Sequence, residues 1–128
     1  MAADVSSVIP AFHYEDAPGA IAFFVEAFGF ELVMMYEGSD GRVAHAQLTC
    51  GTGMMMLGSA RDGDPFSTTG TASVYVIVED ADAHHARAVA AGATIFLPLE
   101  DQDYGGRAFT ATDPEGNLWT FGTYRPEV

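Results

Sequence analysis

Two histidines in predicted strands are the side chains of this sequence best suited to acid–base chemistry. His45 is the sharper candidate, because an imidazole titrates near neutral pH and can act as a general base. The alternative is a histidine that hydrogen-bonds a strand neighbour and does no chemistry, since the sequence assigns it no partner carboxylate. His13 is the weaker candidate, and a structural role is favoured more strongly there. The sequence alone therefore assigns no catalytic residue.

The remaining reactive side chains have structural explanations. His84 and His85 are adjacent in a predicted helix, so they point apart and cannot share one metal ion. His85 is expected to be partly buried against a sheet. Cys50 falls in a predicted turn without a basic neighbour, which disfavours a nucleophilic role.

The charge balance narrows the classes of partner. The chain has 128 residues, 18 of them acidic and 5 basic, so its net charge is 5 − 18 = −13. Nucleic acids and anionic membranes are disfavoured, because both are bound through Lys and Arg. A cationic or neutral small molecule, or a protein partner, remains open. One cysteine, no signal peptide and no long apolar run predict a cytoplasmic protein.

Apolar spacing and turn residues predict ten elements. The first helix follows Asp16, ends at Gly29 and carries an apolar stripe of Ile21, Phe24, Val25 and Phe28. The second opens at Glu79-Asp80-Ala81 and ends near Gly92. Strands are predicted over 8–14, 30–36, 42–49, 54–58, 73–78, 93–97 (stopped by Pro98), 107–112 and 118–124, with a polar loop over 98–106.

The order of these elements repeats. Glu15-Asp16-Ala17 matches Glu79-Asp80-Ala81 at an offset of 64, and Gly58-Ser59 matches Gly122-Thr123 at the same offset. We therefore expect one domain over 1–128, with repeat one at 8–60, a linker at 61–70 and repeat two at 71–124. The fold class is α+β, built from tandem βαβββ repeats.

The first half carries AIAFFVEAFGFEL, then HAQL and GTGMMMLGS. The second carries VYVIVEDADAHHARAVAAGA and then YGGRAFTATDPEGNLWTFGTY, in which the DPEGN turn is most distinctive. In their order and spacing these segments resemble the vicinal oxygen chelate superfamily, which contains glyoxalase I, extradiol dioxygenases, fosfomycin-resistance enzymes and bleomycin-resistance proteins. The resemblance implies two curved mixed sheets around a cleft with the helices outside. It also implies a homodimer whose ligand clefts involve both subunits.

The resemblance also places the family's four metal ligands, usually His, Glu or Gln, at Ile9, Met56, Ser73 and Thr120. None of these side chains is a competent ligand for zinc, nickel, iron or manganese. The sequence therefore predicts no metal, and no other cofactor is indicated.

Strand alternation extends those four positions to a set of cleft residues. In 42–49, Ala44, Ala46 and Leu48 are expected under the helices, which leaves His45 and Gln47 facing the cleft. Thr110 is taken as the repeat partner of His45, and Trp119 is expected in the helix layer. The predicted ligand-binding residues are His13, His45, Gln47, Met56, Ser73, Tyr75, Thr110 and Thr120.

Three functions follow from this pattern. The leading hypothesis is a metal-independent small-molecule-binding protein of the glyoxalase/bleomycin resistance type that sequesters a cationic antibiotic or a similar ligand. The alternative is a cofactor-independent lyase or isomerase that uses His45 as acid and base. The third is an interaction module for another protein, which predicts a large exposed apolar patch.

Overall fold

The computed structural model describes residues 6, 8–63 and 72–126, so most of the predicted linker, 64–70, lies outside the described residues. The first half contains β1 (Ala11–Tyr14), α1 (Ala17–Ala27), β2 (Glu31–Glu37), β3 (Val43–Cys50) and β4 (Gly53–Ser59). The second half contains β5 (Ser73–Ile77), α2 (Ala81–Ala90), β6 (Thr94–Asp101), β7 (Arg107–Thr112) and β8 (Leu118–Gly122). The predicted tandem βαβββ order is confirmed.

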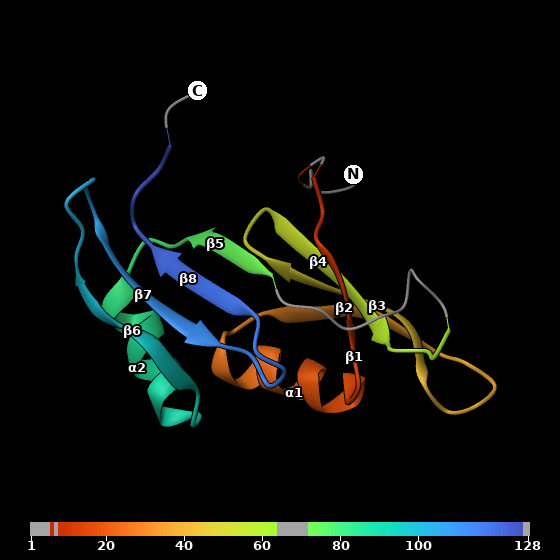
Figure 1. Ribbon diagram of the computed structural model, residues 1–128. Helices are drawn as coiled ribbons and strands as arrows, with labels where there is room; N and C mark the ends of the chain where they lie inside the picture. The colour runs from red at the N-terminus through yellow and green to blue at the C-terminus, as the bar shows by residue number, and fades with distance from the viewer. Residues whose placement is uncertain (1–5, 7, 64–71, 127–128) are drawn as a thin grey trace. The chain divides into compact units, whose positions relative to one another are not determined.

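Each half builds a four-stranded mixed sheet with one helix along one face (Figure 1). The strand orders are β1-β4-β3-β2 and β5-β8-β7-β6, with β1 parallel to β4 and β5 parallel to β8. Ala11 pairs with Met56, and Tyr75 pairs with Thr120, so the offset of 64 holds for both partners. The repeat is therefore structural as well as sequential.

The chain divides into two compact units that do not follow the halves fully. The first unit is Met1–Val25 with Gly29–Gly70, and the second is Glu26–Phe28 with Thr71–Val128. The last two residues of α1, Glu26 and Ala27, thus belong to the second unit. Phe28 packs there against Phe121 and Trp119, with ring centroids 4.8 and 6.0 Å apart.

Helix α1 begins and ends as predicted, but its buried stripe is rotated. Asp16 accepts a hydrogen bond from the Gly19 backbone N at 3.0 Å, and Gly29 ends the helix at φ +74°. Val25, predicted to be buried, is 38% exposed. The stripe starts at Ala17 rather than Ile21, which moves Val25 to its edge. The buried helix positions are Ala17, Ala20, Ile21, Phe24 and Ala27.

Strand β6 corrects two predictions, because it runs through Pro98 and takes in residues 98–101 of the predicted loop. Leu97 pairs with Thr110, whereas the next pair is Glu100 with Ala108, so the ladder is irregular between them. Proline is tolerated at this point because β6 is an edge strand and an irregular register needs no ladder hydrogen bond from it. The loop shrinks to the turn around Gly105 and Gly106.

Strand β3 corrects the expected apolar row. Tyr36 pairs with His45 but Glu37 pairs with Val43, so Ala44 is an extra residue in a bulge. Ala44 is exposed and Val43 takes its place beside the buried Ala46 and Leu48. Because the bulge is defined by the pairing with β2, the alternation of residues in the sequence cannot predict it.

The ends of three predicted strands also change. Cys50 is the last residue of β3 and pairs with Gly53, so it does not lie in the turn itself. Strand β1 begins at Ala11 rather than Val8, and β8 ends at Gly122 rather than Tyr124. The paired core of each sheet is unaffected.

Candidate functional site

Each sheet has one face that its helix does not cover, which we call its open face. On the first sheet this face carries the predicted residues His13, His45, Gln47 and Met56, all half-buried. Ala11, Met56 and Gln47 lie side by side on β1, β4 and β3. The opposite face holds the buried Phe12, Ala46, Met55 and Leu57, so the predicted alternation is confirmed here.

A chain of polar contacts joins three side chains on this face. The His45 ring Nε2 lies 3.0 Å from the Gln47 side-chain oxygen. The Gln47 amide nitrogen donates to the Met54 sulfur at 3.7 Å. Because the Gln47 oxygen can only accept, His45 Nε2 carries the proton in this orientation. In the neutral imidazole the unprotonated nitrogen is then Nδ1.

His13 lies apart from this chain. It pairs with Gly58 on β4, a position without a side chain, and its ring makes no hydrogen bond to the described residues. A Cβ at Gly58 would lie 3.1 Å from the Ala44 carbonyl oxygen, so the bulge in β3 packs directly onto this glycine. The structure joins His45 to Gln47 and sets Gln47 beside Met56, whereas His13 lies next to Gly58, one row along the strand from Ala11.

On the second sheet the open face carries the other four predicted residues. Tyr75, Thr120 and Thr110 form one row across β5, β8 and β7. The hydroxyl oxygens of Thr110 and Thr120 are 2.7 Å apart and share a hydrogen bond. Ser73 pairs with Leu118 in the adjacent row and is exposed.

The register corrects the repeat partner of Thr110. Thr110 pairs with Thr120 as Gln47 pairs with Met56, so Thr110 is equivalent to Gln47 and not to His45. Val43 N donates to the Ser59 hydroxyl as Arg107 N donates to the Thr123 hydroxyl, so the offset is 64 at the start of this strand. The extra residue at Ala44 in β3 reduces the offset to 63 further along.

The four positions assigned to a metal by resemblance do not fit one. They offer an aliphatic chain, a thioether and two hydroxyls, and the Thr120 hydroxyl is already bonded to Thr110. Within residues 6, 8–63 and 72–126, no group of three or more His, Cys, Asp or Glu is arranged to hold an ion.

Two groups have shifted pKa values that bear on chemistry. Burial raises the pKa of the Cys50 thiol, which leaves it protonated and agrees with the expectation that it is not a nucleophile. Burial also lowers the pKa of His84, reinforced by Arg87 and opposed by Asp80. His84 stacks on Phe121 and His85 meets Phe109 edge to face, so both imidazoles lie against the second sheet.

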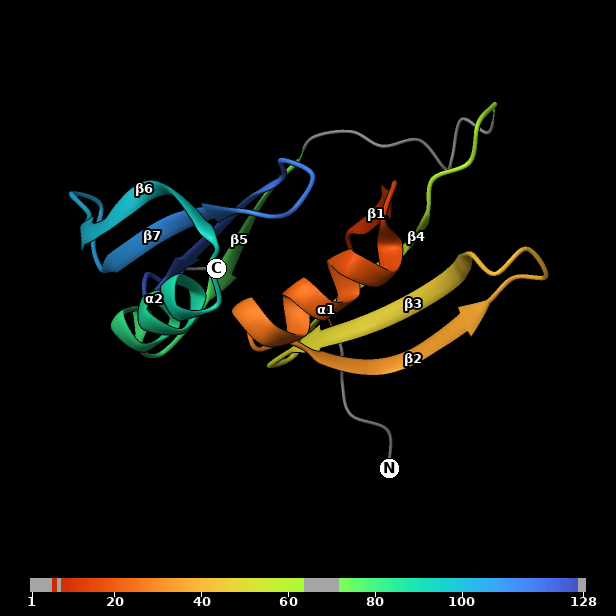
Figure 2. The same cartoon turned by 90° about the horizontal axis from the view of Figure 1, so that it is seen from below.

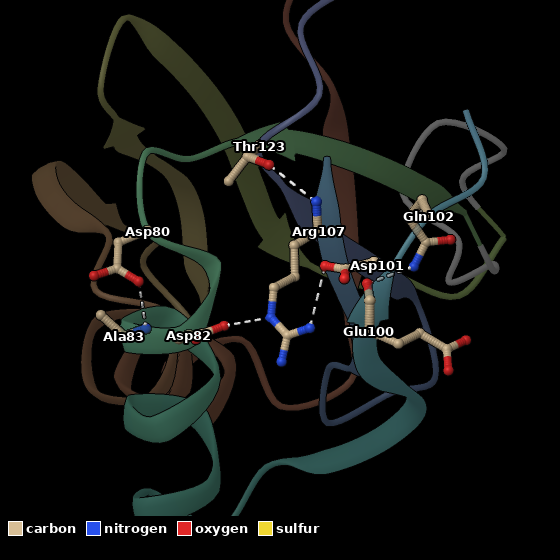
Figure 3. Close-up of polar contacts among 8 residues, drawn as sticks. All are labelled: Asp80, Asp82, Ala83, Glu100, Asp101, Gln102, Arg107 and Thr123. Atoms are coloured by element: carbon tan, nitrogen blue, oxygen red, sulfur yellow. Dashed lines mark hydrogen bonds and ion pairs between the residues drawn. The ribbon is translucent and has the colours of Figure 1, made fainter. Parts of the chain in front are cut away.

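An exposed ion-pair network braces one end of the second sheet (Figure 3). The Arg107 guanidinium contacts the carboxylates of Asp82 on α2 and Asp101 on β6 at 2.7 and 3.3 Å. The hydrogen bond to Asp82, above all, raises the pKa of Arg107. These two contacts occupy the Arg107 guanidinium, so it is not free to pair with an acidic ligand.

Sequence reasoning missed two tyrosines beside Tyr75. The Tyr75 hydroxyl donates to the Tyr124 carbonyl oxygen at 2.8 Å, and the Tyr124 ring meets that of Tyr104. Tyr104 lies in a turn, where alternation assigns no face. Tyr124 lies in the strand predicted over 118–124, where alternation places it on the same face as Thr120, so this signal was available.

The comparisons with known proteins agree with this architecture. Residues 11–121 match the family described as the Glyoxalase/Bleomycin resistance protein/Dioxygenase superfamily. An uncharacterised protein of Mycobacterium tuberculosis strain H37Rv is 35% identical over 122 residues, which are 89% of this chain and 72% of the relative. The chain therefore belongs to this superfamily, and the resemblance drawn from its motifs is confirmed.

Solved structures share the fold. TioX from Micromonospora sp. ML1 superposes with a TM-score of 0.80 at 34% identity, covering 94% of this chain and 99% of TioX. TnmS3, an antibiotic binding protein from Streptomyces sp. CB03234, has a TM-score of 0.72 at 24% identity, covering 92% of this chain and 95% of TnmS3. The second similarity, at that identity, shows the fold alone. Among the described helices, neither is long and apolar enough to cross a membrane.

Proposed function

We propose that this chain is a metal-independent small-molecule-binding protein that sequesters a cationic antibiotic or a ligand of similar chemistry. The proposed ligand-binding residues are His13, His45, Gln47 and Met56 on the open face of the first sheet and Ser73, Tyr75, Thr110 and Thr120 on that of the second. The proposal takes residues 1–128 as one domain that works as a cytoplasmic homodimer with the ligand in a cleft.

The observation that carries this proposal is the chemistry of the open faces. Where the superfamily's enzymes hold ligands for an ion, this chain has side chains that contact neutral or soft groups. Thioethers adapt to irregular apolar surfaces, and the hydroxyls and the Gln47 amide can fix the orientation of a ligand. A net charge of −13 favours a cation over an anion.

The relatives supply a precedent. The family description includes bleomycin resistance proteins, and TnmS3 is an antibiotic binding protein with the same fold. These names concern those proteins. They make a cationic glycopeptide antibiotic the first probe to try on this one.

Isothermal titration with bleomycin tests the proposal, using protein dialysed against a chelator. We expect saturable binding. Its affinity should not rise when the protein is dialysed a second time against zinc or nickel. Gln47→Ala and Tyr75→Ala should weaken binding, whereas Val89→Ala, an exposed change on α2, should leave it unchanged. The proposal is overturned if bleomycin gives no binding heat up to millimolar concentration and if no other cationic antibiotic raises the thermal midpoint of the protein.

Homodimer formation is supported by strand β2. It is an edge strand that exposes Leu32, Val33, Met35 and Tyr36, although soluble monomers seldom expose such contiguous apolar surface. Two chains of charge −13 need an uncharged surface on which to meet. Sedimentation should give a dimer, and Val33→Glu should shift it toward the monomer. A monomeric parent protein at micromolar concentration contradicts this part.

One observation favours the second candidate, a cofactor-independent lyase or isomerase. The contact with Gln47 fixes the His45 tautomer with Nδ1 unprotonated, which is the state that a general base requires. Such an enzyme exchanges substrate protons with solvent. Deuterium incorporation from heavy water into a substrate, lost in His45→Ala with unchanged circular dichroism, would favour the enzyme over the binding protein.

A further inference from the structure

Three tyrosines gather at one end of the second sheet. Tyr75 lies on β5, Tyr104 in the turn between β6 and β7, and Tyr124 directly after β8. The Tyr75 hydroxyl donates to the Tyr124 carbonyl oxygen at 2.8 Å. The rings of Tyr104 and Tyr124 meet edge to face, with centroids 5.2 Å apart and planes at 87°. We call these three residues the tyrosine cluster.

Two glycines hold the tyrosine cluster in place. A Cβ at Gly122 would lie 3.0 Å from the Tyr75 ring carbon Cζ, and one at Gly106 would lie 2.8 Å from the Tyr124 backbone nitrogen. The segment after β8 is also tied to β7, because Arg107 N donates to the Thr123 hydroxyl at 3.0 Å and Thr123 N donates to the Arg107 carbonyl at 3.1 Å (Figure 3). Close contacts with the backbone at Gly122 and Gly106 thus fix the positions of Tyr75 and Tyr124.

The cluster nevertheless leaves aromatic surface open to solvent. Tyr104 is 52% exposed, and Tyr75 and Tyr124 are each 37% exposed. Burial, together with the nearby Tyr104, raises the pKa of Tyr75, so its hydroxyl stays a donor at neutral pH. The faces of aromatic rings carry negative electrostatic potential, which attracts cations and planar aromatic groups.

Carboxylates outnumber cations around the cluster. The adjoining strand end and turn carry Glu100, Asp101 and Asp103, and the cations there are Arg107, which pairs with Asp101, and Arg125, which follows Tyr124. These five side chains leave a net charge of 2 − 3 = −1. An anionic ring system is disfavoured here, whereas a cationic one gains from both the rings and the carboxylates.

We propose that the tyrosine cluster is an aromatic subsite for a planar aromatic cation. It continues the row of Tyr75, Thr120 and Thr110 on the open face, since Tyr75 belongs to both. The inference rests on the proposed small-molecule-binding function and names the chemical group that this end of the sheet selects.

Fluorescence titration with proflavine, a planar aromatic cation, tests the subsite on the full-length protein. We expect saturable binding that weakens as salt is raised. Tyr104→Ala should weaken it about tenfold, the scale of a cation–π and stacking contact at a partly exposed site. Tyr104→Phe keeps the ring and should bind as the parent does. Phe96→Ala removes an exposed aromatic ring from β6 outside the cluster and should also bind normally.

Three outcomes overturn the subsite: no saturable proflavine binding, equal affinity in the parent and Tyr104→Ala, or equally tight binding of the anionic dye anilinonaphthalene sulfonate. The bleomycin titration separates this failure from that of the proposed function. Bleomycin binding that survives in Tyr104→Ala, with proflavine binding absent from the parent, removes the subsite alone. Absence of binding to any cationic antibiotic removes the proposed function.

Discussion

Helix α1 packs on the first sheet with Ile21 and Phe24, whereas helix α2 packs on the second with His85 and Ala88 at the positions 64 residues later (Figure 2). In the first unit, Phe24 stacks on Phe30 with ring centroids 5.5 Å apart and meets Tyr14 at 6.0 Å. In the second, the two α2 imidazoles lie on Phe109 and Phe121 instead. The same backbone plan therefore presents apolar helix side chains to one sheet and imidazoles to the aromatic rings of the other.

The second unit recovers apolar volume from outside its own helix. Phe28, from the end of α1, packs against Trp119 and Phe121 and is counted with this unit. Trp119 is fixed in turn by the Asp113 carboxylate, which accepts from the indole nitrogen at 3.2 Å. The two repeats therefore build their cores from different residues. In the second unit, Phe28 and the buried Asp113 carboxylate stabilise a core whose helix has Ala88 where α1 has Phe24.

Removal of Phe24 should have the largest effect. Phe24→Ala empties the centre of the first core, and we expect it to lower the free energy of unfolding by about 3–5 kcal/mol. Urea denaturation followed by circular dichroism measures this. The matched control is Val25→Ala, one residue away but partly exposed, which should change stability far less. Equal losses in the two variants would contradict the buried stripe described for α1.

Removal of the Asp113 carboxylate should come next, and it probes the second unit. Asp113 is 4% exposed and accepts from the backbone nitrogens of Glu115 and Asn117, the Asn117 amide and the Trp119 indole. Asp113→Ala leaves these donors unpaired, so we expect a loss of about 2–4 kcal/mol and a shift in Trp119 fluorescence. Asp113→Asn keeps one acceptor oxygen and should lose less. The first unit closes the equivalent hairpin with Gly51 at φ +60° and needs no such carboxylate.

The comparison also shows what the sequence can and cannot predict. Helix ends depend on local residues such as Asp16, Asp80 and Gly29, and these predictions are confirmed. The bulge at Ala44 and the continuation of β6 through Pro98 depend on the partner strand, so they were missed. The Tyr75–Tyr124 contact joins residues 49 apart through a backbone carbonyl, for which no sequence pattern exists.

The pH dependence of stability should show a smaller effect, which comes from His84 on α2. Burial lowers the pKa of His84 in the folded state below its ordinary value of 6.5. The unfolded chain then binds more protons as the pH falls below about 6.5, so the free energy of unfolding decreases toward acid. His84→Leu should flatten the stability profile between pH 7 and 5 relative to the parent. Val89→Leu, on the exposed face of α2, controls for added apolar surface and should keep the parent's slope.

The smallest effect should come from the arginines that open β7 and precede β3. Arg107 bridges Asp82 and Asp101, whereas Arg42, one residue before β3, lies 4.0 Å from Asp40, which Arg61 contacts more closely at 3.2 Å. All of these side chains are well exposed, and exposed ion pairs contribute little because water screens them. Arg107→Met should lower the thermal midpoint slightly and Arg42→Met even less, and 1 M salt should erase the difference. A large loss that persists in salt would mean that Arg107 stabilises α2 by packing and not by charge.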